Sequence, residues 1–587
     1  MKPMRFLVAA LLIGLLGIFH AQLRFPAICG VLFWMTSLGL GAFYCRRLDG
    51  DLVWPGRWTR CDTYVLLGLA FAFAPLYLGW LHNIPSDINS DEVVIVQTQI
   101  MHAKDSWNRL LTLSPYFSHP AMNFIVTGHI GQWLGGLSIE TGRLISAAIG
   151  LACVLLTYVF WRLSFPIGLS ICGAVLLGAQ HVFLGVSRMA IWCNQPVLFL
   201  LLSSIFFVIG LRTRQRLWVY AGALAAGLGF YTYMPGRLIF PVWTAVFVQL
   251  PWMIPNRWTW KQALGLWGIA AVGFGLIVAP VIAATLRTPN ASYWTRNTFL
   301  FFPEARQLQK EWVGAHSIAE GLRRNTKDGL LAFNNQVLDM GFIYPNGGSK
   351  KGFSDPLTGV LLWLGVVLAL RQWGRRRGGK EATLWAITGF LAAWITVGAL
   401  TTKAPNYTRL IMALPFAGVL VLMAIRAVWV CLAALFQKQH WSFPLKGLGI
   451  VLVVMTIAVL NGRTFETVMR LIEVRGQDFS GTSRYIEARK QRLPYTFLVV
   501  EDSRYHYFWW YLPGATFNRL SFFANPSQSV RVVEAATIFT TLPPPPFTVF
   551  MNELFWQESR RIWFSLYPSG KDYSLTPAGA CMAFEVS

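Results

Sequence analysis

Residues 264–285 read LGLWGIAAVGFGLIVAPVIAAT, an apolar run without a single charged side chain. As a helix that rises about 1.5 Å per residue, such a run crosses the roughly 30 Å hydrocarbon layer of a bilayer. Comparable runs recur at 64–80, 144–160 and 217–233. The 587-residue chain is 55% hydrophobic and only 13% charged, which soluble cores with water-facing surfaces cannot accommodate. The sequence therefore predicts an all-α polytopic membrane protein, and the lipid bilayer in which it is embedded is one of its partners.

Basic residues concentrate in short connections between the apolar runs, at 46–60, 212–216 and 371–380. A net charge of +24 would suggest nucleic acid as the partner of a soluble chain, but this clustering is the positive-inside pattern. We therefore predict no nucleic-acid partner and place these connections and the N-terminus in the cytoplasm. Three large segments then lie outside, at 83–142, 286–355 and 462–587.

The number of crossings between the first two basic connections must be even, yet five apolar segments occur there. The weakest is 120–136, which carries Asn123, His129 and Gln132, so we predict a juxtamembrane helix on the outer surface. The remaining segments give about thirteen transmembrane helices. These are expected near 5–22, 27–45, 62–82, 143–161, 166–185, 195–211, 218–233, 237–254, 262–285, 356–371, 382–401, 408–426 and 447–461.

The chain is predicted to contain two domains. Residues 1–461 form the transmembrane domain, with outer loops that hold short juxtamembrane helices. The tail differs in texture, because short apolar stretches at 495–501, 531–539 and 547–553 alternate with Pro/Gly turns. We therefore predict a small extracytoplasmic α/β domain over 462–587.

The first outer loop contains the sequence Asn89-Ser90-Asp91-Glu92 before an apolar stretch. Asn89 or Ser90 can cap a helix whose first turn holds both acids near the positive end of the helix dipole, and this is the simplest interpretation. The alternative is that Asp91 is a catalytic base at the mouth of a membrane cavity.

From about Tyr64 to Leu420, the order of features resembles the GT-C superfamily of membrane glycosyltransferases, especially its protein mannosyltransferase-like and aminoarabinose transferase-like branch. The features are the Asp91-Glu92 pair, the segment His119-Pro120, Arg143 at the start of a span, YTYMPGRL at 231–238, and PNYTR at 405–409 before Pro415. The resemblance implies a GT-C type fold. It also implies inverting transfer of a sugar from a polyprenyl-phosphate-linked donor to an acceptor hydroxyl on the extracytoplasmic face.

A lipid phosphate is already a good leaving group, so such an enzyme must mainly deprotonate the acceptor and stabilise the departing phosphate. Asp91 is the predicted base, and Glu92 either orients it or caps the helix. Arg237, Arg409 and Lys403 fall at predicted outer ends of spans, where they can bind the donor phosphate. The alternative for each cation is interfacial snorkelling.

Other predicted contacts are less specific. Relatives of the aminoarabinose transferase type carry a second acidic residue where this chain has Asn194 and no acid, so no second carboxylate is carried over. The further candidate substrate contacts are His119, Arg188, Asn194 and Tyr233. Within 286–355, candidate acceptor or sugar contacts, each also explained by a solvated helix face, are Glu304, Glu311, His316 and Asp339.

The first outer loop has no DxD metal signature and the chain has no CxxC pair, so we predict no metal site and no cofactor. The partners are then the lipid-linked sugar donor and an acceptor glycan, lipid or protein. The expected location is the cytoplasmic (inner) membrane, with the N-terminus cytoplasmic and the C-terminal domain extracytoplasmic.

A polytopic transporter or lipid flippase is the main alternative, because it also needs many helices and outer loops. Transporters usually place ionisable groups or broken, repeat-related helices near the bilayer midplane. The central parts of the predicted spans are nearly free of charge, which favours the enzyme. A catalytically inactive lipid-binding relative is the third interpretation.

Overall fold

The structure is a computed structural model of the whole chain. It describes residues 4–19, 26–54, 58–81, 85, 90–104, 107–114, 118–254, 257–288, 291, 293–333, 352–374, 381–402, 404, 406–436, 444–470, 482, 485–489, 491, 495–501, 528–575 and 581–587.

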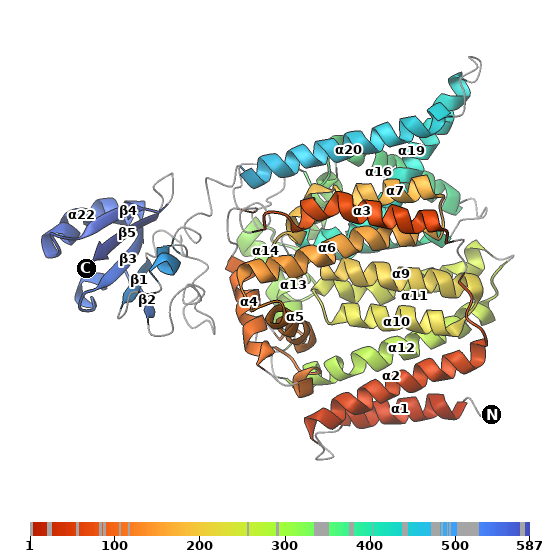
Figure 1. Cartoon of the computed structure of the whole chain (residues 1–587), viewed down its shortest axis with the longest axis horizontal. Helices are drawn as coiled ribbons and strands as arrows, with labels where there is room; N and C mark the ends of the chain where they lie inside the picture. Colours follow the sequence, from red (N-terminus) through yellow and green to blue (C-terminus); the bar gives the residue numbers. More distant parts are fainter. Residues whose placement is uncertain are drawn as a thin grey trace.

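Long apolar helices form one bundle (Figure 1). They are α1 (Met4–Phe19), α2 (Ala27–Asp49), α3 (Arg60–Leu78), α6 (Ile139–Arg162), α7 (Ile167–Gly178), α8 (His181–Ser187), α9 (Gln195–Thr213), α10 (Arg216–Phe230), α11 (Ile239–Met253), α12 (Trp260–Arg287), α16 (Pro356–Gly374), α17 (Glu381–Gly398), α19 (Leu414–Phe436) and α20 (Pro444–Arg470).

Nine helices of the described part are long and apolar enough to cross a membrane, or up to ten if the bent pair α7 and α8 forms one span. Helix α1 is apolar but has 16 residues, and α10 and α11 have 15 each. The chain is therefore an integral multi-pass membrane protein, as predicted, whereas the count of thirteen spans stays a prediction.

Small residues let neighbouring helices approach closely. This is usual in membranes, where lipid is as apolar as the helices and their association depends on close packing. One example joins α16 to α19, where a Cβ on Gly365 would come within 2.1 Å of the Leu420 carbonyl oxygen. Because a side chain cannot fit there, the glycine fixes the contact between these two helices.

The segment expected to be a single span at 166–185 is instead broken, because α7 and α8 meet at an angle of 63°. Gln180 stabilises the break, since its Oε1 accepts a hydrogen bond from the Phe183 amide and its Nε2 donates to the Phe353 carbonyl, both at 2.7 Å. The break aims residues 188–194 toward the end of the bundle that carries the first outer loop.

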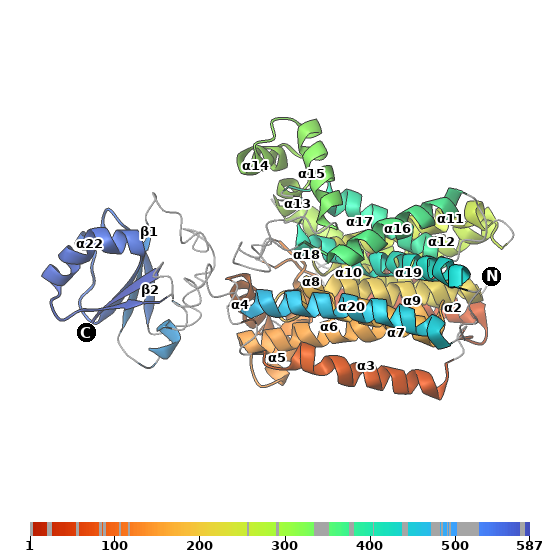
Figure 2. The same ribbon diagram turned by 90° about the horizontal axis from the view of Figure 1, so that it is seen from above.

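The segment 83–142, predicted to be the first outer loop, contains α4 (Ser90–Ala103), η1 (Trp107–Arg109) and α5 (Ala121–Trp133). Helix α5 confirms the helix predicted at 120–136, and its 13 residues span only about 20 Å, too short for a membrane crossing. Both views place α4 and α5 at one end of the bundle, here called the α4 end (Figures 1 and 2). Their placement on the membrane surface stays a prediction.

The second outer segment contains α13 (Tyr293–Thr298), α14 (Pro303–Val313) and α15 (Ile318–Ala332). It is joined to the bundle by backbone hydrogen bonds from Leu300 to the Leu400 carbonyl (3.0 Å) and from Thr402 to the Thr298 carbonyl (2.8 Å). Figures 1 and 2 both show α14 at the α4 end.

The C-terminal region confirms the predicted small α/β domain. Its sheet has the order β2-β1-β3-β5-β4, with β1 parallel to β2 and β3, and β5 antiparallel to β3 and β4. The elements are β1 (Thr496–Glu501), β2 (Ser529–Glu534), β3 (Phe547–Asn552), α22 (Glu553–Leu566), β4 (Lys571–Ser574) and β5 (Cys581–Val586). Trp563 of α22 and Phe584 of β5 are both fully buried in the core of the domain.

Candidate active site

Helix α4 begins at Ser90, so Asp91 and Glu92 lie in its first turn, near the positive end of the helix dipole. Residues 93–96 are buried and anchor the helix. Asp91 remains partly exposed, whereas Glu92 is fully buried. Successive side chains of an α-helix point about 100° apart, so the two neighbouring carboxylates face different surroundings.

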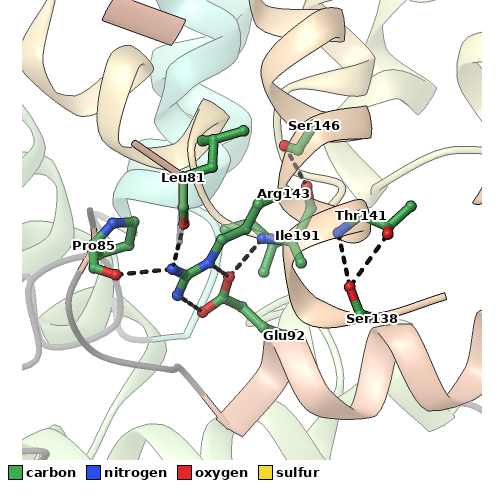
Figure 3. A network of polar contacts seen from close by, with 9 residues as sticks. Leu81, Pro85, Glu92, Ser138, Thr141, Arg143, Ser146 and Ile191 are labelled. Carbon is green, nitrogen blue, oxygen red and sulfur yellow. Dashed lines mark hydrogen bonds and ion pairs between the residues drawn. The ribbon is translucent and has the colours of Figure 1, made fainter. Parts of the chain in front are cut away.

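Glu92 forms a buried ion pair with Arg143 of α6 (Figure 3). The Arg143 guanidinium donates to both carboxylate oxygens, at 2.8 and 2.9 Å, and to the carbonyls of Leu81 (3.1 Å) and Pro85 (2.8 Å). The Glu92 Oε1 also accepts a hydrogen bond from the Ala190 amide at 2.7 Å. These bonds satisfy both charges, so Glu92 fixes the first turn of α4 against α6 and the 188–194 loop.

Two predicted substrate contacts in the 188–194 loop have structural partners. Arg188 donates to the carbonyls of Leu76, Tyr77 and Gly79, at the C-terminal end of α3. Asn194 is fully buried, and its Nδ2 donates to the Ser146 carbonyl at 2.7 Å. Their hydrogen bonds place the loop; their predicted contact with substrate remains a prediction.

The buried thiol of Cys193 lies where groups from three segments meet. Burial raises the pKa of this thiol, and the negative charge of Asp91 raises it further, whereas a hydrogen bond with Thr408 and the charge of Arg409 lower it. The Ala190 amide of the same loop donates to Glu92, the neighbour of Asp91, at 2.7 Å. The 188–194 loop therefore contacts both the first turn of α4 and the segment that carries Arg409.

Arg409 is buried in the short helix α18 (Tyr407–Leu410). Its Nη1 donates to the Thr402 carbonyl at 3.4 Å, but its Nε is buried and has no hydrogen-bond partner among the described residues. The neighbouring Thr408 hydroxyl lies 3.1 Å from the Tyr233 hydroxyl and donates to the Asn406 Oδ1 at 2.6 Å. Part of the guanidinium is therefore available to a further acceptor.

Arg237 lies in the short helix η2 (Met234–Leu238) and stacks over the Phe230 ring at 5.1 Å. Its Nε is also buried without a hydrogen-bond partner in the described part of the chain. Burial, and then the charge of Arg237, lower the pKa of His119 to about 3. His119 is therefore neutral near pH 7, so Arg237 faces a neutral imidazole.

A row of rings joins the surroundings of the two arginines. The centroids of His119 and Trp192 lie 4.9 Å apart, and those of Trp192 and Tyr233 lie 6.4 Å apart. Arg237 acts on His119, and Tyr233 contacts the segment that carries Arg409. The predicted residues His119 and Tyr233 thus belong to one neighbourhood with both arginines.

Trp192, Cys193 and Thr408 were not predicted from the sequence. Thr408 falls within the quoted PNYTR segment, which offered a signal, whereas nothing in the spacing pointed to Trp192 or Cys193. Lys403, Asn89 and Asp339 lie outside the described residues. No group of three or more His, Cys, Asp or Glu side chains in the described part could hold a metal ion, and metal independence stays a prediction.

Comparison with solved structures gives the fold. ArnT from Cupriavidus metallidurans in the apo state is similar with a TM-score of 0.52 and 16% identity, over 90% of this chain and 98% of that chain. The same enzyme bound to undecaprenyl phosphate gives a TM-score of 0.51 and 15% identity, over 90% and 97%. No family model matches the sequence, and no curated protein matches it. The TM-scores above 0.5 over nearly the whole of both chains show that the chain has the fold of ArnT, as the resemblance implied.

Proposed function

We propose that the chain is an inverting glycosyltransferase. It moves a sugar from a polyprenyl-phosphate-linked donor to an acceptor hydroxyl on the extracytoplasmic face of the cytoplasmic membrane. The observation that carries the proposal is geometric: Glu92 ties the helix turn that carries Asp91 to the 188–194 loop, and Trp192 of this loop lies beside Tyr233, whose hydroxyl contacts Thr408 next to Arg409. The fold shared with an ArnT structure that holds undecaprenyl phosphate supports the lipid-linked donor.

The reaction needs one displacement. Asp91 accepts the proton of the acceptor hydroxyl, and the acceptor oxygen forms a bond to the anomeric carbon from the face opposite the phosphate. The bond from the anomeric carbon to the phosphate oxygen breaks, and the polyprenyl phosphate leaves with the electron pair. A single displacement from the opposite face inverts the anomeric centre.

Arg409 and Arg237 stabilise the charge that develops on the leaving phosphate, because guanidinium donates two parallel hydrogen bonds to phosphate oxygens. Their buried Nε atoms, which have no hydrogen-bond partner among the described residues, are suited to this task. Lys403 is proposed as a third cation. Glu92 is a positioning residue that acts through Arg143, and Trp192 and Tyr233 pack between the two arginine neighbourhoods.

The experiment uses full-length protein in nanodiscs, a panel of labelled polyprenyl-phosphate sugars and cell-envelope acceptors. Asp91→Asn should lower kcat by about 100- to 10,000-fold, because it removes the general base. Asp572→Asn, which changes a half-buried carboxylate of β4 that pairs with Arg560 in the C-terminal domain, is the control and should retain activity. Unchanged turnover in Asp91→Asn would remove Asp91 from the mechanism.

Lipid flipping is the second candidate, because transporters also use broken helices such as α7 and α8. The same protein in liposomes, with a fluorescent polyprenyl phosphate in one leaflet, separates the two functions. Transport of the lipid with no glycosylated product in any donor and acceptor combination would favour the flippase.

A further inference from the structure

A side chain from a third helix caps the break between α7 and α8. Helix α20 lies beside α7 in both views and contacts α7 and α8 (Figures 1 and 2). Its residue Asn461 is 2% exposed, and the Asn461 Oδ1 accepts a hydrogen bond at 3.2 Å from the amide of His181, the first residue of α8. The first amides of a helix have no carbonyl partner within that helix, so Asn461 caps α8 from a different helix.

Asn461 also joins α8 to the beginning of α16. Its Nδ2 donates to the Oδ2 of the buried Asp355 at 2.8 Å. The Asp355 Oδ1 accepts a hydrogen bond from the Thr358 amide, in the first turn of α16, at 2.9 Å. Every donor to this carboxylate in the described part of the chain is uncharged. Asn461, Asp355 and the start of α8 therefore form one connected unit, here called the α8 junction.

Helix α8 carries the position of the junction to the loop beside the candidate base. The helix has seven residues, a length of about 10 Å, and the 188–194 loop follows it directly. Its last residue, Ser187, packs on α6 so closely that a Cβ on Gly150 would come within 2.5 Å of the Ser187 side chain. The loop then binds Glu92 through the Ala190 amide. A displaced start of α8 therefore displaces the loop that holds the first turn of α4.

The junction also contacts the segment that carries Arg409. Gln180, the residue before α8, donates to the carbonyl of Phe353, two residues before Asp355. The Phe353 ring stacks on the Tyr407 ring, with the centroids 5.2 Å apart and an angle of 4° between the planes. Tyr407 begins α18, the helix that contains Arg409. The α8 junction is thus connected to both the candidate base and a candidate phosphate ligand.

We propose that Asn461 is a positioning residue of the transferase, which acts through α8, the 188–194 loop and Glu92 on the base Asp91. This inference rests on the proposed transferase function, since it names a residue that supports that reaction from outside the site. The role requires an acceptor toward His181 and a donor toward Asp355, and the side-chain amide of Asn461 supplies both.

The first test compares two variants of the full-length protein in nanodiscs. Asn461→Leu removes both hydrogen bonds of the junction. Gln249→Leu is the matched control, because it removes an amide that also joins two helices, α11 and α17, through Thr388. We expect kcat to fall about 10- to 100-fold in Asn461→Leu, because the base is misplaced, and KM for the polyprenyl-phosphate sugar to stay within about twofold. Unchanged kcat in Asn461→Leu, or an equal fall in both variants, would overturn the proposal.

The second test exchanges the donor and the acceptor of the junction. Asn461→Asp places a second carboxylate against Asp355, so it should lower kcat as Asn461→Leu does. In Asp355→Asn/Asn461→Asp the new carboxylate on α20 can accept from the His181 amide and from the new amide on α16. The double variant should therefore recover most of the lost kcat. A double variant no more active than Asn461→Asp would contradict the positioning role.

The third test needs no sugar transfer. Cys193 of the loop and Cys45 of α2 are both buried, so their rates of alkylation by N-ethylmaleimide report local opening and general loosening of the bundle, respectively. Asn461→Leu should raise the rate at Cys193 about tenfold, the effect of one lost hydrogen bond, and leave Cys45 unchanged. Peptide mass spectrometry measures both rates, and Gln249→Leu should change neither. A Cys193 as protected as in wild type, or an equal rise at Cys45, would refute the link from α20 to the loop.

Positioning and transfer fail separately. If wild type transfers sugar and Asn461→Leu changes neither kcat nor Cys193 labelling, the positioning role falls and the transferase stands. If wild type gives no product with any donor and acceptor while Asn461→Leu still exposes Cys193, the transferase falls and only the structural link from α20 to the loop stands.

Discussion

The two ends of α6 each carry an arginine–carboxylate pair whose carboxylate is buried. Arg143 pairs with Glu92 at the α4 end, and Arg162 pairs with Asp62 at the opposite end, about 28 Å away along the helix. Asp62 also accepts hydrogen bonds from the Tyr158 hydroxyl at 2.6 Å and the Thr59 amide at 2.8 Å. Both pairs are well satisfied, so a buried ion pair alone does not mark a functional site.

What differs is the surroundings of the two pairs. Beside Glu92 lies a second, partly exposed carboxylate, Asp91, and the 188–194 loop that Glu92 binds leads through Trp192 and Tyr233 to the segment that carries Arg409. Arg237 and Arg409 both keep a buried Nε without a partner in the described part. The pair at the opposite end ties α3 to α6. Closed hydrogen-bond networks therefore stabilise the bundle, whereas incompletely paired charges beside them point to chemistry.

The largest effect is expected from Arg143→Met, which breaks the pair at the α4 end. Removal of one partner leaves the Glu92 charge buried, a loss of about 3–5 kcal/mol in the free energy of unfolding. Chemical denaturation in detergent measures it. The double variant Glu92→Leu/Arg143→Met should recover part of this stability but not the activity, because α4 is no longer fixed. Full activity in the double variant would contradict the positioning role of Glu92.

Arg409→Gln should lower kcat by about 100- to 1,000-fold, because it removes a donor that stabilises the developing phosphate charge. Steady-state kinetics with a polyprenyl-phosphate sugar measures it. Arg162→Gln, at the opposite end of α6, is the control and should leave kcat of the folded protein within about twofold. An equal loss of kcat in Arg409→Gln and Arg162→Gln would contradict the assignment of the active site to the α4 end alone.

Asp62→Asn tests the ion pair at the opposite end of α6. It weakens hydrogen bonds to Tyr158 and Arg162 and should lower the free energy of unfolding by about 1–3 kcal/mol. Activity per folded molecule should not change. A fall in kcat without a change in thermal unfolding would show that the far end of α6 takes part in the reaction.

The smallest effect concerns His119, whose pKa of about 3 lies below its ordinary value of 6.5. The unfolded chain binds the proton first, so stability is complete above pH 6.5 and is lost as the pH falls below it. The loss should reach about 1 kcal/mol by roughly pH 5.5. Thermal unfolding against pH should show this slope in wild type and not in His119→Gln; an equal slope in both would exclude His119 as its source.

Local pattern was sufficient to predict the helices and the small α/β domain, since apolar length and alternation are properties of short segments. It also predicted that Asp91 and Glu92 open a helix. It did not pair Glu92 with Arg143, 51 residues away, because that contact depends on how α4 packs on α6. The break between α7 and α8 was not predicted for a similar reason. Gln180, which stabilises the break, donates a hydrogen bond to the carbonyl of Phe353, a residue far away in the sequence.

For the candidate site, too, local features could be predicted from the sequence and long-range contacts could not. Residues with unusual chemistry in polar loops, such as Asp91 and Arg409, could be singled out from the sequence. Trp192 and Cys193 could not, because an aromatic ring and a thiol next to an apolar run are ordinary core residues. Only the bend that carries the 188–194 loop to α4 brings them beside the charged groups.

The most direct test of the central claim is an experimental structure of the full-length protein with bound polyprenyl phosphate. The phosphate should lie within hydrogen-bond distance of Arg409 or Arg237. It should also lie on the same side of Cys193 as the Asp91 carboxylate. A phosphate bound away from both arginines, or an Asp91 carboxylate directed into bulk water far from it, would contradict the account.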